Sequence, residues 1–211
     1  MSWRLLQLAD SAFPAGGFAH SAGLEAARWL GEVDGEDRVA GFVAAILWQA
    51  GNLALPFVEA ARRAGPDTLA SLDRRCEAAL ASHVARRASR AQGRAWSRAC
   101  AESFRLAAAL APLPHGHLPV VFGATTRELA AGDVGLVFLH LAARGPLSAA
   151  VRLGAIGPYA AQRIQDRLAP LVDEVLAACA GRTIDDAASS APLEDLFGAL
   201  HDAMPARLFQ S

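Results

Sequence analysis

The chain has 211 residues, the length of one domain or of one domain with a short tail, and its formal net charge of −1 gives no general attraction to nucleic-acid phosphates. Its hydrophobic fraction of 53% and mean hydropathy of +0.24 are high, but charged residues interrupt every apolar stretch before about 18 residues, so no transmembrane helix is expected. The N-terminus has no basic region followed by a long apolar segment, and we therefore expect a cytoplasmic protein that binds neither nucleic acid nor membrane.

A glycine-rich turn near the N-terminus, within residues 10–25, is predicted to lead into a helix. Pro14 fixes φ for a tight turn, while Gly16 and Gly17 allow a positive φ. Such junctions are common wherever a chain turns sharply, so a helix entry that needs its glycines explains the pattern without any chemistry. The glycine spacing matches neither a phosphate-binding loop nor a dinucleotide-binding fingerprint.

The residues after the glycines carry the helix start. His20 or Ser21 can accept hydrogen bonds from the first backbone N–H groups of the helix. Glu25 lies one residue too late for a capping box on Ser21. We therefore expect its carboxylate to face solvent or a partner.

Helical spacing of apolar residues predicts the next elements. Apolar side chains within residues 39–50 recur at helical intervals, and this helix is expected to end near Gly51 and Asn52. Residues 68–111 are rich in Ala and Arg and contain no Pro, which predicts one or two long central helices. The best strand candidate, residues 120–123, is short and is interpreted as the start of another helix.

Glycine and proline punctuation divides the chain into about nine or ten helical pieces. The fold class predicted from this pattern is all-α, a bundle built as a single domain over residues 1–191. Residues 192–211 are expected to form a C-terminal helix and a docking tail, because a terminus with an aromatic and an Arg in its last five residues is unlike an ordinary frayed end.

Four arginines recur at every fourth position of the predicted central helix and indicate a solvated basic face: Arg86, Arg90, Arg94 and Arg98. On the same helix, Ser89 and Gly93 are also four residues apart. A glycine inside a helix costs about 1 kcal/mol relative to Ala, so we expect a neighbouring helix or a second subunit to approach the backbone closely there.

Other residues that could carry chemistry are few. His115 and His117 form the only close histidine pair, and two imidazoles in a Pro-rich loop make an incomplete metal site, so no metal ligand and no intrinsic cofactor are predicted. The three cysteines are widely spaced and are interpreted as buried thiols: Cys76, Cys100 and Cys179. No catalytic signature is recognisable, and no catalytic residue is assigned.

Two late segments look like contact points. Arg152, Gly154 and Gly157 precede a proline suited to the start of a new helix, which indicates a hinge or a close helix contact. The terminal residues Arg207 and Phe209 flank Leu208 in the expected docking tail.

Five segments in the same order resemble the UreF family of urease accessory proteins. They are the Asp-Ser, Pro-x-Gly-x-Phe and His-Ser-x-Gly-Leu-Glu elements of the first turn, an Arg-x-x-Ser-x-x-x-Gly-like stretch, a His-x-Pro-Val-x-x-Gly segment, an Arg-Leu-Gly-x-x-Gly segment and the Arg-Leu-Phe-x-Ser end, at residues 5–25, 87–93, 117–123, 152–162 and 192–211. Gln210 stands where the family has a basic residue, and residues 204–206 replace a more polar run.

The resemblance implies a urease maturation chaperone. It would be an all-α protein that forms a homodimer and links UreD (also called UreH) and the GTPase UreG to apo-urease. Nickel would pass through the complex, and GTP would be bound by the partner GTPase, whose hydrolysis is coupled to nickel insertion. A GTPase-regulating Arg acting in trans would have a physical basis, but no Arg is assigned to it.

The resemblance and the residue patterns together give a hypothesis for the contact sites. Partner-binding surfaces are expected at the two ends of the chain, at Asp10, Ser11, Pro14, Gly16, Gly17, Phe18, His20, Ser21, Gly23, Glu25, Arg207, Leu208, Phe209 and Ser211. Dimer or helix contacts are expected in the middle of the chain, at Ser89, Gly93, Arg152, Gly154 and Gly157.

Two alternatives come from other functional classes. The first is an all-α enzyme with a pocket between helices near His20, which would show convergent polar groups with shifted pKa values. The second is a DNA-binding helical regulator that uses the arginine face, against which the near-neutral charge counts.

Overall fold

The computed structural model describes residues 3–104 and 113–210, and within these ranges the fold is all-α with no strand, which confirms the predicted fold class. In chain order the elements are α1 (Trp3–Ala9), η1 (Gly17–Ala19), α2 (Leu24–Trp29), α3 (Gly35–Gln49), η2 (Ala50–Ala54), α4 (Leu55–Arg63), α5 (Pro66–Ala79), α6 (His83–Phe104), α7 (Leu118–Thr125), α8 (Ala131–Arg152), α9 (Pro158–Arg167), α10 (Ala169–Cys179) and α11 (Pro192–His201).

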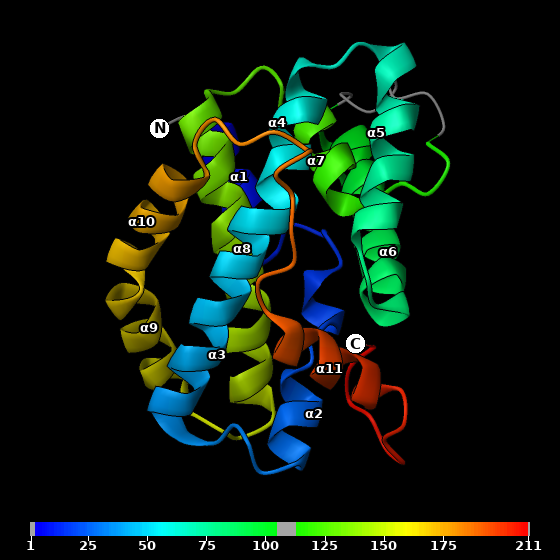
Figure 1. Ribbon diagram of the computed structural model, residues 1–211. Helices are drawn as coiled ribbons and strands as arrows, with labels where there is room; N and C mark the ends of the chain where they lie inside the picture. The colour runs from blue at the N-terminus through cyan, green and yellow to red at the C-terminus, as the bar shows by residue number, and fades with distance from the viewer. Residues whose placement is uncertain (1–2, 105–112, 211) are drawn as a thin grey trace.

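The helices α3 and α8 form the middle of the molecule (Figure 1). Helices α9 and α10 cover one side of this pair, and α4 to α7 make a second group on the other side. Helix α11 crosses the front and packs on α2, α3 and α6, so the C-terminal segment lies beside the N-terminal part of the chain.

Three aromatic side chains link α6 and α7 to α8, in the middle of the molecule. Trp96 of α6 is fully buried, and its ring centroid lies 4.6 Å from that of Phe122 in α7. Phe122 in turn meets Phe138 of α8 edge to face at 5.1 Å. The indole N–H of Trp96 donates to the Thr125 hydroxyl at 2.9 Å, so the buried donor is satisfied. The core thus extends through three successive helices of the chain, α6, α7 and α8.

The helix over residues 39–50 does not end at Gly51 and Asn52, as the sequence suggested. It continues through the π-helical turn η2 directly into α4. Pro56 has no N–H to donate to the carbonyl of Asn52 four residues earlier, and this carbonyl accepts from the backbone N–H of Ala188 at 3.3 Å. Gly51 serves packing, because a Cβ there would overlap Val175 of α10.

Other expectations about the elements are confirmed. Residues 68–104 lie in two long helices, α5 and α6, and residues 105–111 of that prediction lie outside the described ranges. Residues 120–123 are helical, within α7. All three cysteines are buried free thiols, and burial raises the pKa of Cys76 to about 12 and that of Cys100 to about 11.

Two helical stretches are long and apolar enough to cross a membrane, by length and composition only: Gly35–Arg63 and Ala131–Arg152. In each, 56% of the most apolar window is buried inside the chain. Core helices of water-soluble proteins pass the same test, so this is weak evidence for a membrane span.

Candidate partner-binding site

The glycine-rich turn is a junction between loop and helix, as the sequence predicted. Gly16 and Gly23 have φ values of +76° and +86°, in the left-handed region that favours glycine. A Cβ on Gly23 would lie 2.9 Å from the backbone nitrogen of Gly198 in α11. The turn therefore needs this glycine both for its conformation and for the close approach of α11 to the start of α2.

Glu25 does not face solvent, and that expectation was wrong. Its carboxylate is buried and lies against the chain's own C-terminal tail. One oxygen accepts from the backbone N–H of Leu208 at 2.7 Å, and the other accepts from the N–H of Phe209 at 3.1 Å and lies 2.8 Å from Nε2 of His201. Near Glu25 itself, Ser21 Oγ lies 3.4 Å from the Glu25 backbone nitrogen, which is a weak cap.

Arg152 joins the turn to the tail. Its guanidinium lies 4.0 Å from the ring centroid of Phe18 and 4.4 Å from that of Phe209, and its Nη1 donates to the Phe18 carbonyl at 2.7 Å. Both cation–π contacts are within the range that stabilises such pairs. The side chain of Phe209 is buried, and the N–H of Gln210 donates to the Ala19 carbonyl at 2.8 Å.

The structure therefore brings the two predicted end surfaces together into one region, which we call the joined ends: residues 10–25 and 207–210, with Arg152 between them. The sequence could not show this pairing, because it depends on contacts more than 120 residues apart. Ser211, the last predicted site residue, lies outside the described residues. Whether these residues bind a partner stays a prediction.

The chain changes direction around Gly154, between α8 and α9. Gly154 has a φ of +71°, and Arg28 donates to the carbonyl oxygens of Leu153 and Gly154. Gly157 precedes Pro158, which begins α9. Contacts within the chain therefore explain this turn, and a hinge or a dimer contact at Arg152, Gly154 and Gly157 stays a prediction.

The exposed face of α11 is apolar. Within residues 192–206, every side chain classed as exposed is Pro, Leu or Ala. Leu193, Leu196 and Leu200 are 61%, 51% and 37% exposed and recur at the spacing of one helix face. Leu208 of the tail is also exposed. We call these four leucines the α11 face; an apolar strip of this kind on a surface helix is typical of a protein-binding site.

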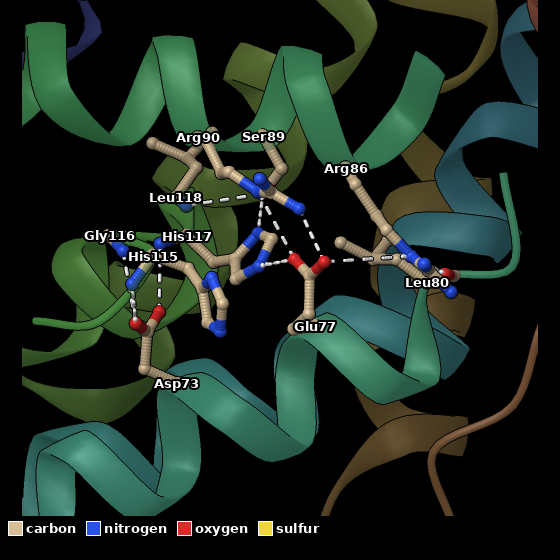
Figure 2. A network of polar contacts seen from close by, with 10 residues as sticks. All are labelled: Asp73, Glu77, Leu80, Arg86, Ser89, Arg90, His115, Gly116, His117 and Leu118. Atoms are coloured by element: carbon tan, nitrogen blue, oxygen red, sulfur yellow. Dashed lines mark hydrogen bonds and ion pairs between the residues drawn. The ribbon is translucent and has the colours of Figure 1, made fainter. Parts of the chain in front are cut away.

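A second set of polar contacts, away from the joined ends, explains Ser89 and Gly93 (Figure 2). A Cβ on Gly93 would overlap the carbonyl oxygen of Gly116, so the approaching element is the loop before α7 of the same chain. Ser89 Oγ accepts from the backbone N–H of Leu118 at 3.2 Å and lies 3.1 Å from Nδ1 of His117. These residues make an internal contact of this chain, and a dimer contact at Ser89 and Gly93 stays a prediction.

Asp73 and Glu77 complete this set from α5. The Asp73 carboxylate accepts three consecutive backbone N–H groups, those of residues 115, 116 and 117, at 2.6 to 3.0 Å. Nε2 of His117 lies 2.7 Å from Glu77, and burial lowers the pKa of this histidine. Figure 2 shows how Asp73 and Glu77 of α5 hold the loop before α7.

The arginine face is only partly solvated, which corrects the expectation. Arg90 is paired with Glu77, and Nε of Arg86 donates to the Leu80 carbonyl at 2.6 Å. Only Arg94 and Arg98 of the four are exposed. The first half of the stripe therefore holds α6 against α5.

The chain Ser89, His117 and Glu77 resembles the order of a hydrolase triad, but its geometry is that of a structural link. Ser89 lies inside α6, and its oxygen is already occupied by the Leu118 N–H. His117 is fully buried, between Ser89 and Glu77. Within the described residues, no group of three or more His, Cys, Asp or Glu side chains is placed to hold a metal ion.

A hollow of about 1180 Å³ lies between the glycine-rich turn, α3, α6 and α8. Most of its lining is apolar, and His20 and His140 are among the polar residues on it. The pKa of His20 is lowered to about 4, mainly by burial and then by the charge of Arg87. Burial also lowers the pKa of His140. Both imidazoles are therefore neutral near pH 7, as expected for buried histidines beside arginines.

Comparisons with known proteins give one consistent result. The model of the UreF family matches residues 33–169. Urease accessory protein F of Oryza sativa subsp. japonica is 35% identical, over 98% of this chain and 84% of its own length, and that of Arabidopsis thaliana is 33% identical, over 100% and 93%. Urease accessory protein UreF of Mycobacterium sp. (strain JLS) is 35% identical, over 98% and 97%.

Proposed function

We propose a function for this chain from its family: the chain belongs to the UreF family of urease accessory proteins. In this proposal it is the scaffold that links UreD/UreH and the GTPase UreG to apo-urease. The role in urease maturation follows from the family itself. The relatives are accessory proteins, so the chain is an accessory protein rather than the enzyme with a pocket near His20.

The observation that supports a scaffold is the α11 face beside the joined ends. The exposed leucines of α11 would gain about 25 cal/mol for each Å² of apolar surface that a partner covers. The tail that carries Leu208 is held in place by Glu25 and Arg152, so the partner would meet an ordered surface rather than a frayed end. We assign this surface to UreD.

Nickel and GTP belong to the complex in this proposal. Nickel is cargo that passes through the assembled accessory proteins, and GTP is bound and hydrolysed by UreG. This chain would hold its partners in position and would bind no cofactor of its own. We further propose that it works in the cytoplasm as a homodimer, so that two copies of each partner can be gathered around apo-urease.

The test is co-expression of this chain with UreD and UreG from the same source, followed by size-exclusion chromatography with light scattering. We expect one co-eluting complex. Leu196→Asp, which places a charge on the α11 face, should abolish association with UreD while the far-ultraviolet circular dichroism stays unchanged.

The matched control is Leu136→Asp, because Leu136 of α8 is 42% exposed, close to the 51% of Leu196, and lies outside the α11 face. This variant should bind UreD normally. Equal binding by both variants would show that UreD does not cover α11, and the absence of any complex with the unaltered chain would overturn the scaffold proposal.

A further inference from the structure

A polar hollow of about 680 Å³ lies between α6 and the tail, and His20 lines both this hollow and the large apolar one. We call it the arginine pocket; its charged residues are Arg87, Asp202 and Arg207. Arg87 binds Asp202 with both terminal nitrogens, Nη1 to Oδ2 at 2.9 Å and Nη2 to Oδ1 at 2.6 Å. Arg207 donates to the same Oδ1 at 2.9 Å.

The pocket holds more positive than negative charge. Two guanidinium groups share the single carboxylate of Asp202, whose Oδ2 also lies 3.2 Å from Nε2 of His83. The hydrogen bonds and charge of Arg87, the hydrogen bond of His83 and the charge of Arg207 lower the pKa of Asp202 to about 2. Arg152 packs on the ring of Phe209, which also lines the pocket, and it has no ion pair with any residue that the structure describes. His20, which lines the pocket too, is kept neutral partly by Arg87.

The two arginines of this pocket keep unused donors. A guanidinium has five N–H donors, and Arg207 uses one of its nitrogens in the contacts with Asp202. The side chains of Arg87 and Arg207 are 51% and 42% exposed, so their remaining donors are within reach of a bound protein. A planar guanidinium fork fits a carboxylate best, as the pair of Arg87 with Asp202 already shows.

The pocket is continuous with the α11 face. Asp202 directly follows the last residue of α11, and Arg207 directly precedes the exposed Leu208. A protein that covers the leucines therefore extends over the arginines as well. Its matching surface would need apolar residues for α11 and a negative charge for the pocket.

We propose that the arginine pocket receives an aspartate or glutamate side chain of the protein that covers the α11 face. The inference rests on the proposed function, and it adds the chemistry by which that partner is recognised. The acidic side chain binds Arg87 and Arg207 from the open side, where Asp202 neutralises only part of their charge.

The test measures the dissociation constant of the complex with UreD by isothermal titration calorimetry, at low and at high salt. Arg87→Gln should weaken binding about tenfold and reduce its salt dependence, because one charge pair is removed. Arg94→Gln is the matched control on the same helix, since Arg94 is exposed and pairs with no residue that the structure describes; it should bind as the unaltered chain does.

Asp202→Asn separates recognition from a merely structural role. If Arg87 only anchors the tail through Asp202, both Arg87→Gln and Asp202→Asn weaken binding. If the pocket attracts a carboxylate, Asp202→Asn raises its net positive charge and tightens binding about threefold.

The remaining outcomes are also decisive. Unaltered binding by Arg87→Gln, with the unaltered chain still bound to UreD, would overturn the carboxylate site and leave the scaffold standing. A failure of the unaltered chain to bind UreD would instead overturn the proposed function. Tight binding of inorganic phosphate to the lone chain, abolished by Arg87→Gln and without effect on the complex, would show that the pocket serves a free anion.

Discussion

The contact of Glu25 with the tail allows a quantitative test. Glu25→Gln keeps the shape of the side chain but replaces one carboxylate oxygen with an NH₂ group. The three neighbours of this carboxylate include two backbone N–H donors, those of Leu208 and Phe209, which cannot reorient. At least one donor must then face another donor in a buried site.

The magnitude follows from these hydrogen bonds. A hydrogen bond to a charged group contributes about 1.5–3 kcal/mol, and a buried donor left without an acceptor costs a further 1–3 kcal/mol, so about 3 kcal/mol is expected for the attachment of the tail. Because about 1.4 kcal/mol corresponds to a factor of ten, the tail should open about 100-fold more often. The loss is local, since the tail is a terminal segment.

Amide hydrogen exchange of Leu208 and Phe209 measures this opening directly. Protection of both amides should fall by about two orders of magnitude in Glu25→Gln, while amides of α8 stay as they were. Glu32→Gln is the control, because Glu32 is exposed and close in sequence. Equal protection in Glu25→Gln and the unaltered chain would refute the role given to this carboxylate.

Three further predictions concern packing and titration. Gly93→Ala should lower the free energy of unfolding by about 1–3 kcal/mol in urea titrations, whereas Gly132→Ala, with open space around it, should not. The imidazole of His20 should titrate near pH 4 by NMR; its depressed pKa means that stability falls as the pH drops from about 6.5 toward 4, and a midpoint near 6.5 would contradict its burial. The thiol of Cys76, with a pKa raised to about 12, should resist alkylation at pH 8 until the chain is unfolded.

The fold class was predictable from local signals, because helical periodicity and the spacing of Gly and Pro depend on neighbouring residues. The end of α3 was not. Gly51 and Asn52 are typical helix breakers, but here Val175 packs where a Cβ would stand and Ala188 supplies the donor that the Asn52 carbonyl needs. These partners lie more than 120 residues away, beyond any local pattern.

The same limit applies to the candidate site. The two ends of the chain were each identified from residue patterns, whereas their union through Glu25 and Arg152 depends on tertiary contacts. The position of Glu25, one residue too late for a capping box with Ser21, was a usable signal, since a glutamate that does not serve its own helix start needs another role. Nothing in the sequence marked Asp73 or Glu77, because a carboxylate in an Arg-rich helix has the composition of an ordinary surface.

The loop that Asp73 holds has a wider consequence. Three successive backbone N–H groups converge on one carboxylate beside Gly116, whose φ is +71°. Backbone of this shape is a nest, the concave motif with which many proteins bind phosphate or other anions from solution. Here the anion is covalently part of the chain and is never exchanged, so the loop before α7 keeps its form at any ionic composition. Asp73→Gly would remove this carboxylate and leave the three N–H groups free to bind an anion from solution. Small carboxylates such as formate would then bind there and restore the fold in proportion to their concentration.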